Sequence, residues 1–241
     1  MMKKKLIFTL ALLICMGMML TGCGDNTEAN PEGTWFIAQD TAIPAEQLVL
    51  KGNGTGTRGS DEYIENLDYI IDENNNRIII TEEDGYTWSL DMVDFNTDTP
   101  KLQKTGDPFQ HYYVKEDAHE AEHARLLREN IELLTTVGYW RNEEELHYIN
   151  FRPIEDLDNL SDDALIYLEG FGWDITPDNS RSISWWMGGT DIVYVQIGAL
   201  TGDTIIKLYI LTDENGESYL CDQNGEILFE EYAEAVTTIK E

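Results

Sequence analysis

The residues best suited to chemistry lie in the segment HEAEH, residues 119–123. This segment matches H-E-x-x-H, a pattern in which two histidines one helical turn apart bind zinc and the glutamate activates a zinc-bound water. Under this hypothesis His119 and His123 are metal ligands and Glu120 is the general base of peptide hydrolysis. Two of the five positions are unrestricted, so the surrounding sequence has to decide whether the pattern is functional.

The sequence around HEAEH lacks the other parts of a catalytic zinc site. Such a site needs a third protein ligand beside the water. The run that follows, ARLLREN, holds no third histidine, and Glu143–Glu145 fall in a segment that reads as a turn. Glu122 adds a charge within the pattern, and on a solvated helix start it can pair with Arg125. We therefore expect no enzymatic activity. A zinc peptidase with Glu120 as its base, and a non-catalytic zinc site at the two histidines, are the alternatives.

The motif lies at the start of the one clear helical pattern, which we predict for residues 117–137. Leu127, Ile131 and Leu134 recur at spacings of four and three, so they share one face that should pack on a core. Gly138 then ends the helix.

Most of the remaining chain consists of short segments rich in β-branched and aromatic residues. RIIIT, YTWSLDMV and HYYVK precede the helix, and DIVYVQIG, IIKLYILT and SYLCD follow it. Turn-forming runs such as GNGTG, DENNN and DQNG separate them. Many short strands with such turns are typical of small antiparallel barrels or sandwiches. The predicted fold class is therefore mainly β, with two small domains joined by one helix.

The two β regions repeat each other. Gly33-Thr34-Trp35 returns as Gly138-Tyr139-Trp140. Further pairs keep almost the same spacing from these tryptophans: Tyr69 and Trp173, Arg77 and Arg181, Lys101 and Lys207, and Tyr113 and Tyr219. We therefore predict two copies of one domain, at residues 32–116 and 138–222. The rest, residues 223–241, is a C-terminal extension that we predict to be helical.

With G-x-W at the entry of each copy, the chain resembles the small lipocalin-like domains that occur singly or in tandem in bacterial lipoproteins. This resemblance implies two antiparallel lipocalin-like barrels, in which the tryptophan packs across one end. A barrel of about eight strands is filled by side chains or holds one small ligand. Trp173, Trp185 and Trp186 are the candidate ligand-binding residues, although neighbours such as Trp185 and Trp186 point to opposite faces of a strand.

The first residues resemble the signal of a bacterial lipoprotein. Three lysines precede the uncharged run Leu6–Leu20, which is short for a membrane span. The run ends in Leu20-Thr21-Gly22-Cys23, which is similar to a lipobox. The resemblance implies that residues 1–22 are a cleaved signal peptide and that Cys23 is acylated. Residues 23–31 would then be a tether that anchors an extracytoplasmic protein to the lipid bilayer.

Charge excludes some partners. The chain carries a net charge of −30, and without residues 1–22 its 13 basic and 46 acidic residues give −33. Such a field repels nucleic acid and attracts cations, so we expect no nucleic-acid partner. The acidic run at residues 155–165, EDLDNLSDDAL, offers carboxylates to calcium, although a solvated loop explains it equally.

Together these features predict a surface-anchored, non-enzymatic lipoprotein that binds an unknown small ligand or an envelope protein. A structural or interaction protein of the cell envelope is a further alternative. We expect no cofactor. Zinc at HEAEH and calcium at the acidic residues are the metal alternatives.

Overall fold

The computed structural model describes residues 30–40, 46–60, 63–152, 154, 157–197, 204–213 and 215–232. The predicted signal peptide and Cys23 lie outside these residues. The described residues form sixteen strands and the helices α2 (Glu116–Thr136) and α3 (Asp162–Ile166), with one short 3-10 helix, η1 (Leu157–Asn159).

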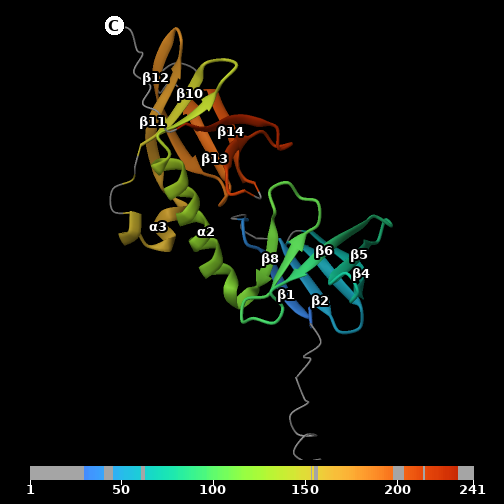
Figure 1. The fold of residues 1–241 in the computed structure, drawn as a ribbon. Coiled ribbons are helices and arrows are strands. Elements are labelled where there is room, and N and C mark those ends of the chain that lie inside the picture. The colour runs from blue at the N-terminus through green and yellow to red at the C-terminus, as the bar shows by residue number, and fades with distance from the viewer. Residues whose placement is uncertain are drawn as a thin grey trace, which may run out of the picture. The chain divides into compact units, whose positions relative to one another are not determined.

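The first eight strands close into an antiparallel barrel, called barrel 1 below (Figure 1). They are β1 (Gly33–Ile37), β2 (Gln47–Lys51), β3 (Thr55–Ser60), β4 (Tyr63–Asp72), β5 (Arg77–Glu82), β6 (Thr87–Val93), β7 (Lys101–Lys104) and β8 (Tyr112–Lys115). Each strand pairs with the next, and β8 returns to β1, where Trp35 lies opposite Lys115. Alternate side chains point inward, and Trp35, Leu48, Ile80 and Leu102 fill the interior without any exposed surface.

The last eight strands close in the same order into barrel 2. They are β9 (Tyr139–Asn142), β10 (His147–Phe151), β11 (Glu169–Thr176), β12 (Asn179–Met187), β13 (Ile192–Ile197), β14 (Thr204–Thr212), β15 (Ser218–Cys221) and β16 (Ile227–Tyr232). Trp140, Phe151 and Trp185 fill its interior. This up-and-down, eight-stranded order is that of lipocalin barrels. The predicted fold class, mainly β with two antiparallel barrels joined by one helix, is therefore confirmed.

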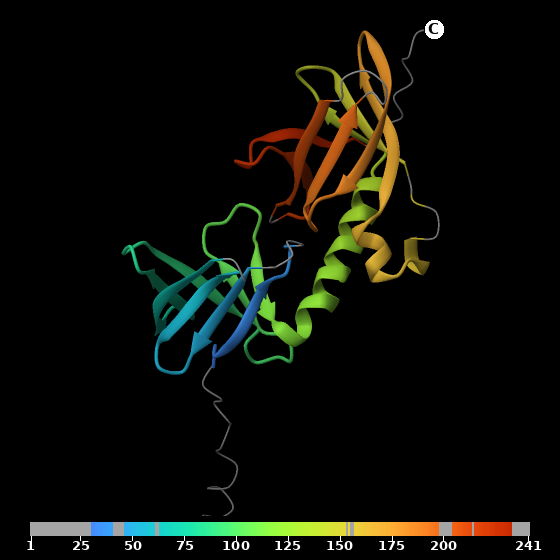
Figure 2. The same cartoon turned by 180° about the vertical axis from the view of Figure 1, so that it is seen from behind.

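Helix α2 runs from barrel 1 to barrel 2 (Figures 1 and 2). Its apolar face is the predicted one, since Leu127, Ile131 and Leu134 are buried in the core of barrel 2. Burial of each such side chain stabilises the fold by about 1.5–3 kcal/mol. The Trp140 indole N–H donates to the Leu134 carbonyl at 3.4 Å, which fixes the end of α2 against barrel 2. Among the described helices, none has both the length and the apolar character needed to cross a membrane.

The predicted register of the repeat is wrong beyond its first tryptophans. Trp35 and Trp140 occupy equivalent first strands, but Arg77 is in the fifth strand of barrel 1 and Arg181 is in the fourth strand of barrel 2. The cause is the connection between second and third strands, which is residues 52–54 in barrel 1 and residues 152–168 in barrel 2. The longer connection of barrel 2 holds η1 and α3. Its extra residues are about as many as one strand with its turn. Equal spacing along the sequence therefore matches each later strand of barrel 2 with the strand one further along in barrel 1.

The same shift explains a second wrong prediction, the helix at residues 223–241. Tyr219 is taken as the equivalent of Tyr113, which ends the second copy at residue 222. Tyr113 is in the eighth strand of its barrel but Tyr219 is in the seventh, so this end is one strand too early. Residues Ile227–Tyr232 are the strand β16, which pairs with β15 and β9 and closes barrel 2. Residues 233–241 lie outside the described part of the chain.

Candidate functional site

HEAEH forms part of the contact between α2 and barrel 1. The Nε2–H of His119 donates to the Ile37 carbonyl at 3.1 Å, and the Nδ1–H of His123 donates to the Ala38 carbonyl at 3.0 Å. Because a carbonyl oxygen only accepts, each of these nitrogens carries a proton, and a lone pair is left only on the other ring nitrogen; that of His123, Nε2, is buried without a hydrogen-bond partner among the described residues. Glu120, the candidate general base, is exposed to solvent. The two histidines therefore fasten α2 to the end of β1.

Glu122, inside the same motif, makes the most connected contact of this interface. Its carboxylate accepts from Lys101 Nζ at 2.9 Å, from the Tyr112 hydroxyl at 2.6 Å, and from Arg125 at 2.8 and 2.9 Å. The hydrogen bond from Arg125 is the main cause that lowers the pKa of Glu122 to about 2. The residue that departs from the peptidase pattern is thus the one that holds α2 on β7 and β8.

The described residues do not gather a metal-ligand set. No three His, Cys, Asp or Glu side chains among them are placed to hold one ion, whether at HEAEH or in the described part of residues 155–165. The remaining histidines have other partners: His111 lies between Asp107 and Asp191, and His147 bonds to Asp174.

The three candidate tryptophans do not meet in one cavity. Trp185 is fully buried, and its ring meets Phe151 edge-on in the core of barrel 2. Trp186 points to the other face of β12 and stacks on Tyr194, as the alternation of side chains along a strand requires. Trp173 is 38% exposed, with the Arg152 guanidinium over its ring.

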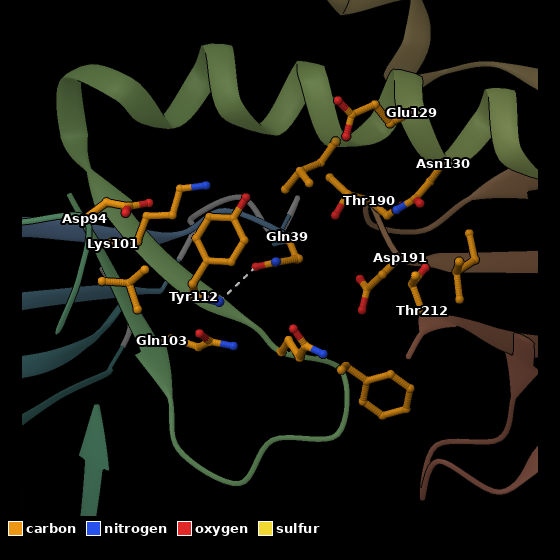
Figure 3. Close-up of a pocket in the computed structure, with 15 residues that line it drawn as sticks. Gln39, Asp94, Lys101, Gln103, Tyr112, Glu129, Asn130, Thr190, Asp191 and Thr212 are labelled. Atoms are coloured by element: carbon orange, nitrogen blue, oxygen red, sulfur yellow. Dashed lines mark hydrogen bonds between the residues drawn. The ribbon is translucent and has the colours of Figure 1, made fainter. Parts of the chain in front are cut away.

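A cavity of about 420 Å³ with both polar and apolar walls lies between the barrels and is called the interbarrel cavity below (Figure 3). Barrel 1 and its loops, α2 and barrel 2 all contribute walls, and Figure 3 shows side chains from the three parts facing one another. Its polar lining consists of Gln39, Asp94, Lys101, Gln103, Gln110, Tyr112, Glu129, Asn130, Thr190, Asp191 and Thr212. Val93, Phe109, Leu126 and Ile210 complete it. This size is within the range of pockets for small ligands.

Thr190 is fixed at the junction of the three parts. Its N–H donates to the Gln39 carbonyl of barrel 1 at 3.2 Å, and its carbonyl accepts from Asn130 Nδ2 of α2 at 2.8 Å. Its side chain is fully buried, yet the hydroxyl has no hydrogen-bond partner among the described residues. A buried polar group without a partner costs about 1–3 kcal/mol, so this hydroxyl marks a place that a ligand or water would satisfy.

Two lining residues have an unusual backbone. Asp94 and Gln110 have φ values of 57° and 55°, in the left-handed region that residues with a Cβ rarely adopt. Such conformations cost about 1–2 kcal/mol per residue. They concentrate at functional sites, where the surrounding structure holds them in place. Both residues lie in loops of barrel 1 that border the cavity.

His111 joins the two barrels beside the cavity. Its Nδ1–H donates to Asp107 Oδ2 at 2.6 Å, and its Nε2–H donates to Asp191 Oδ2 at 2.9 Å. Both acceptors are carboxylates, so the ring is favoured in its doubly protonated form. Burial lowers the pKa of His111, but the hydrogen bonds and charges of Asp191 and Asp107 outweigh it, so the pKa is raised.

A second cavity, of about 230 Å³, shares Gln39 and Asp191 with the first. It lies at the end of barrel 1 where Arg58 is found, and its other wall is the start of β13 with the preceding glycines. Arg58 donates to Glu46 at 2.8 Å and to Glu82 at 3.0 Å. Its charge is thereby compensated by two carboxylates, while Lys104 and His111 also line this cavity.

Sequence reasoning did not find the interbarrel cavity. Gln39, Gln103, Asn130 and Thr190 are far apart in the chain and meet only because both barrels contact α2. One local signal was present, the run Gly188-Gly189-Thr190-Asp191. A Cβ on Gly189 would lie 3.3 Å from the Gln39 carbonyl, so glycine permits the close approach of the two barrels there.

Comparisons of the chain with protein-family models, with curated proteins and with solved structures found no match.

Proposed function

We propose that this protein is a non-enzymatic binding lipoprotein, anchored outside the cytoplasm through acylated Cys23, with its ligand site in the interbarrel cavity. The cavity itself is the observation that carries the proposal. It combines an unpartnered buried hydroxyl at Thr190 with left-handed backbone at Asp94 and Gln110. Both barrel interiors, in contrast, are occupied by apolar side chains. The space between the barrels is therefore the better candidate for a ligand.

The anchoring part is supported by Leu20-Thr21-Gly22-Cys23 after a basic and apolar segment. Expression of the full chain in a bacterial host tests it. We expect the wild type to carry a diacylglyceryl group on Cys23 and to enter the detergent-rich phase, whereas C23A does neither. The control C15A, altered within the predicted signal peptide, should behave as the wild type. Equal partition of wild type and C23A would contradict the anchor.

The proposal includes no catalytic step. One nitrogen of His119 and one of His123 already donate to main-chain carbonyls, and Glu120 is exposed. The carboxylate between them, Glu122, is used by Lys101 and Tyr112. These contacts support a role of HEAEH in docking α2 rather than in peptide hydrolysis.

Ligand-detected NMR with a set of small polar fragments tests the binding part on the full chain in detergent. Q103W places a large side chain in the cavity and should abolish binding of the fragments that the wild type binds. Q196W is the matched control, because Gln196 is half-buried on β13 and does not line the cavity. A fragment set that binds equally to all three proteins, or to none, would contradict the cavity as a ligand site. It would favour a structural role in the envelope.

A further inference from the structure

We propose that the interbarrel cavity binds a small linear diamine or polyamine, with one ammonium group at Asp94 and another at Asp191. This inference rests on the proposed binding function and names the chemical class of its ligand.

The charged groups of the cavity leave Asp94 without a partner and Asp191 with only a share of one cation, because His111 pairs with both Asp107 and Asp191. Lys101 is paired with Glu122, and both oxygens of Glu129 accept from Arg125 at 2.6 Å. The Asp94 carboxylate, however, has no hydrogen-bond or ion-pair partner among the described residues. Asp191 uses only Oδ2, toward His111, which leaves Oδ1 without a partner there. Two carboxylates, each with an acceptor oxygen that has no partner among the described residues, therefore face the cavity.

The two carboxylates come from different parts of the protein. Asp94 follows β6 of barrel 1, and Asp191 precedes β13 of barrel 2. Figure 3 shows them on opposite sides of the cavity, with Gln39 and Tyr112 between them. A flexible chain with a cationic group at each end suits two carboxylates placed in this way. An ammonium group on each carboxylate forms a charge-assisted hydrogen bond, which is stronger than a neutral one.

The wall between the carboxylates suits the rest of such a ligand. The buried Thr190 hydroxyl and the side-chain oxygens of Gln103 and Asn130 have no partners among the described residues, so they are open to N–H donors. Phe109 and Ile210 offer apolar surface to methylene groups. A polyamine alternates these two kinds of group along one chain.

Other ligand classes fit less well. Among the described residues of the lining, an anion would find one cationic side chain, Lys101, which is already engaged by Glu122 and lies over the Tyr112 ring. A divalent metal would need several oxygen ligands close together, and no such group exists in the described residues. The net charge of −33 expected after removal of residues 1–22 raises the local concentration of cations in general. Specific binding therefore has to be separated from this diffuse attraction.

Isothermal titration of the full chain in detergent at physiological salt tests the proposal, with 1,4-diaminobutane and spermidine as probes. n-Butylamine, with one ammonium, and 1,4-butanediol, with none, have the same carbon chain as 1,4-diaminobutane and serve as controls. We expect both to bind at least about tenfold more weakly than the diamine, since each lacks a charge-assisted contact. Equal affinity of butylamine and the diamine would overturn the two-carboxylate arrangement.

Two variants separate the site from the general field. D94N should weaken diamine binding by about three- to fivefold, the range for an ion pair at an exposed carboxylate. D98N removes the same charge from the same loop; Asp98 is exposed like Asp94 but lies outside the cavity, so binding should stay within about twofold. Equal losses in both variants, or full displacement of the diamine by an equal concentration of Mg²⁺, would show diffuse attraction only and would overturn the proposal.

The outcome also separates this inference from the proposed function. If neither probe binds but fragments still bind in a Gln103-sensitive manner, the amine assignment fails and the cavity keeps its role. If neither probes nor fragments bind, both proposals fail. Matching thermal unfolding of D94N and the wild type shows that the variant is folded.

Discussion

Replacing Glu122 by glutamine should loosen α2 from barrel 1 without touching the core. Glu122 is held by Lys101, Tyr112 and Arg125, and its side chain is 16% exposed. The glutamine of E122Q keeps the shape but loses the charge, and its NH₂ group would face donors. We therefore expect a lower free energy of unfolding for E122Q.

The size of the effect follows from the pKa of Glu122. Its value of about 2, against an ordinary value of 4.5, corresponds to about 3 kcal/mol of interaction with the charged form. The Arg125 side chain is 45% exposed, and solvent screening of that partner reduces the net stabilisation to about 1–2 kcal/mol. Because the pKa is lowered in the folded state, this contribution is present above pH 4.5 and is lost as the pH falls toward 2.

Urea unfolding at pH 7 and at several lower pH values measures this contribution. E122Q should be less stable than the wild type by about 1–2 kcal/mol at pH 7, and the difference should shrink between pH 4.5 and 2. E120Q is the matched control, because Glu120 belongs to the same helical turn but is exposed. It should remain within about 0.5 kcal/mol of the wild type. An equal loss in both variants, or no loss in E122Q, would refute the docking role of Glu122.

Three further variants test the core, the junction and the cavity. I131A removes a fully buried side chain from the core of barrel 2 and should lower the free energy of unfolding in urea by about 2–5 kcal/mol. The control E132A alters an exposed residue and should change it by at most about 0.5 kcal/mol. Similar losses in both variants would contradict the packing of α2. The pKa of His111 is raised in the folded state, so its contribution to the free energy of unfolding is complete below the unfolded pKa of about 6.5 and is lost as pH rises through the folded value. The stability difference between wild type and H111Q should therefore shrink from pH 6 to pH 9. Growth of that difference would contradict the role of His111 as a bridge between the barrels. T190V replaces the unpartnered hydroxyl and should stabilise the free protein by about 1 kcal/mol while weakening diamine binding; destabilisation would show that the hydroxyl has a partner.

Local patterns were sufficient for much of the architecture. The strand-rich segments, the turns and the spacing of Leu127, Ile131 and Leu134 predict two β domains and an amphipathic helix, because each depends on neighbours in sequence. The predicted position of each strand within barrel 2 is wrong because the connection at residues 152–168 is longer than its counterpart in barrel 1 by about the length of one strand and its turn. Spacing alone cannot distinguish a strand from a loop of similar length, so β16 was missed.

The candidate site was less predictable because it depends on contacts between distant segments. HEAEH has the spacing of a zinc motif, but its histidines donate to the carbonyls of Ile37 and Ala38, more than eighty residues earlier in the chain. Nothing in the local sequence specifies those acceptors. The same holds for Thr190. Its hydroxyl is seen to lack a hydrogen-bond partner only in the folded protein, where Gln39 and Asn130 bind its main chain.

Hydrogen–deuterium exchange of the full chain, with and without saturating spermidine, tests most directly whether the interbarrel cavity is the ligand site. We expect slower exchange in residues 105–112 and 188–192, which border the cavity from the two barrels, and no such change in D94N. Unchanged exchange in both segments, or slower exchange only elsewhere, such as around the exposed Phe171 and Trp173, would contradict this assignment.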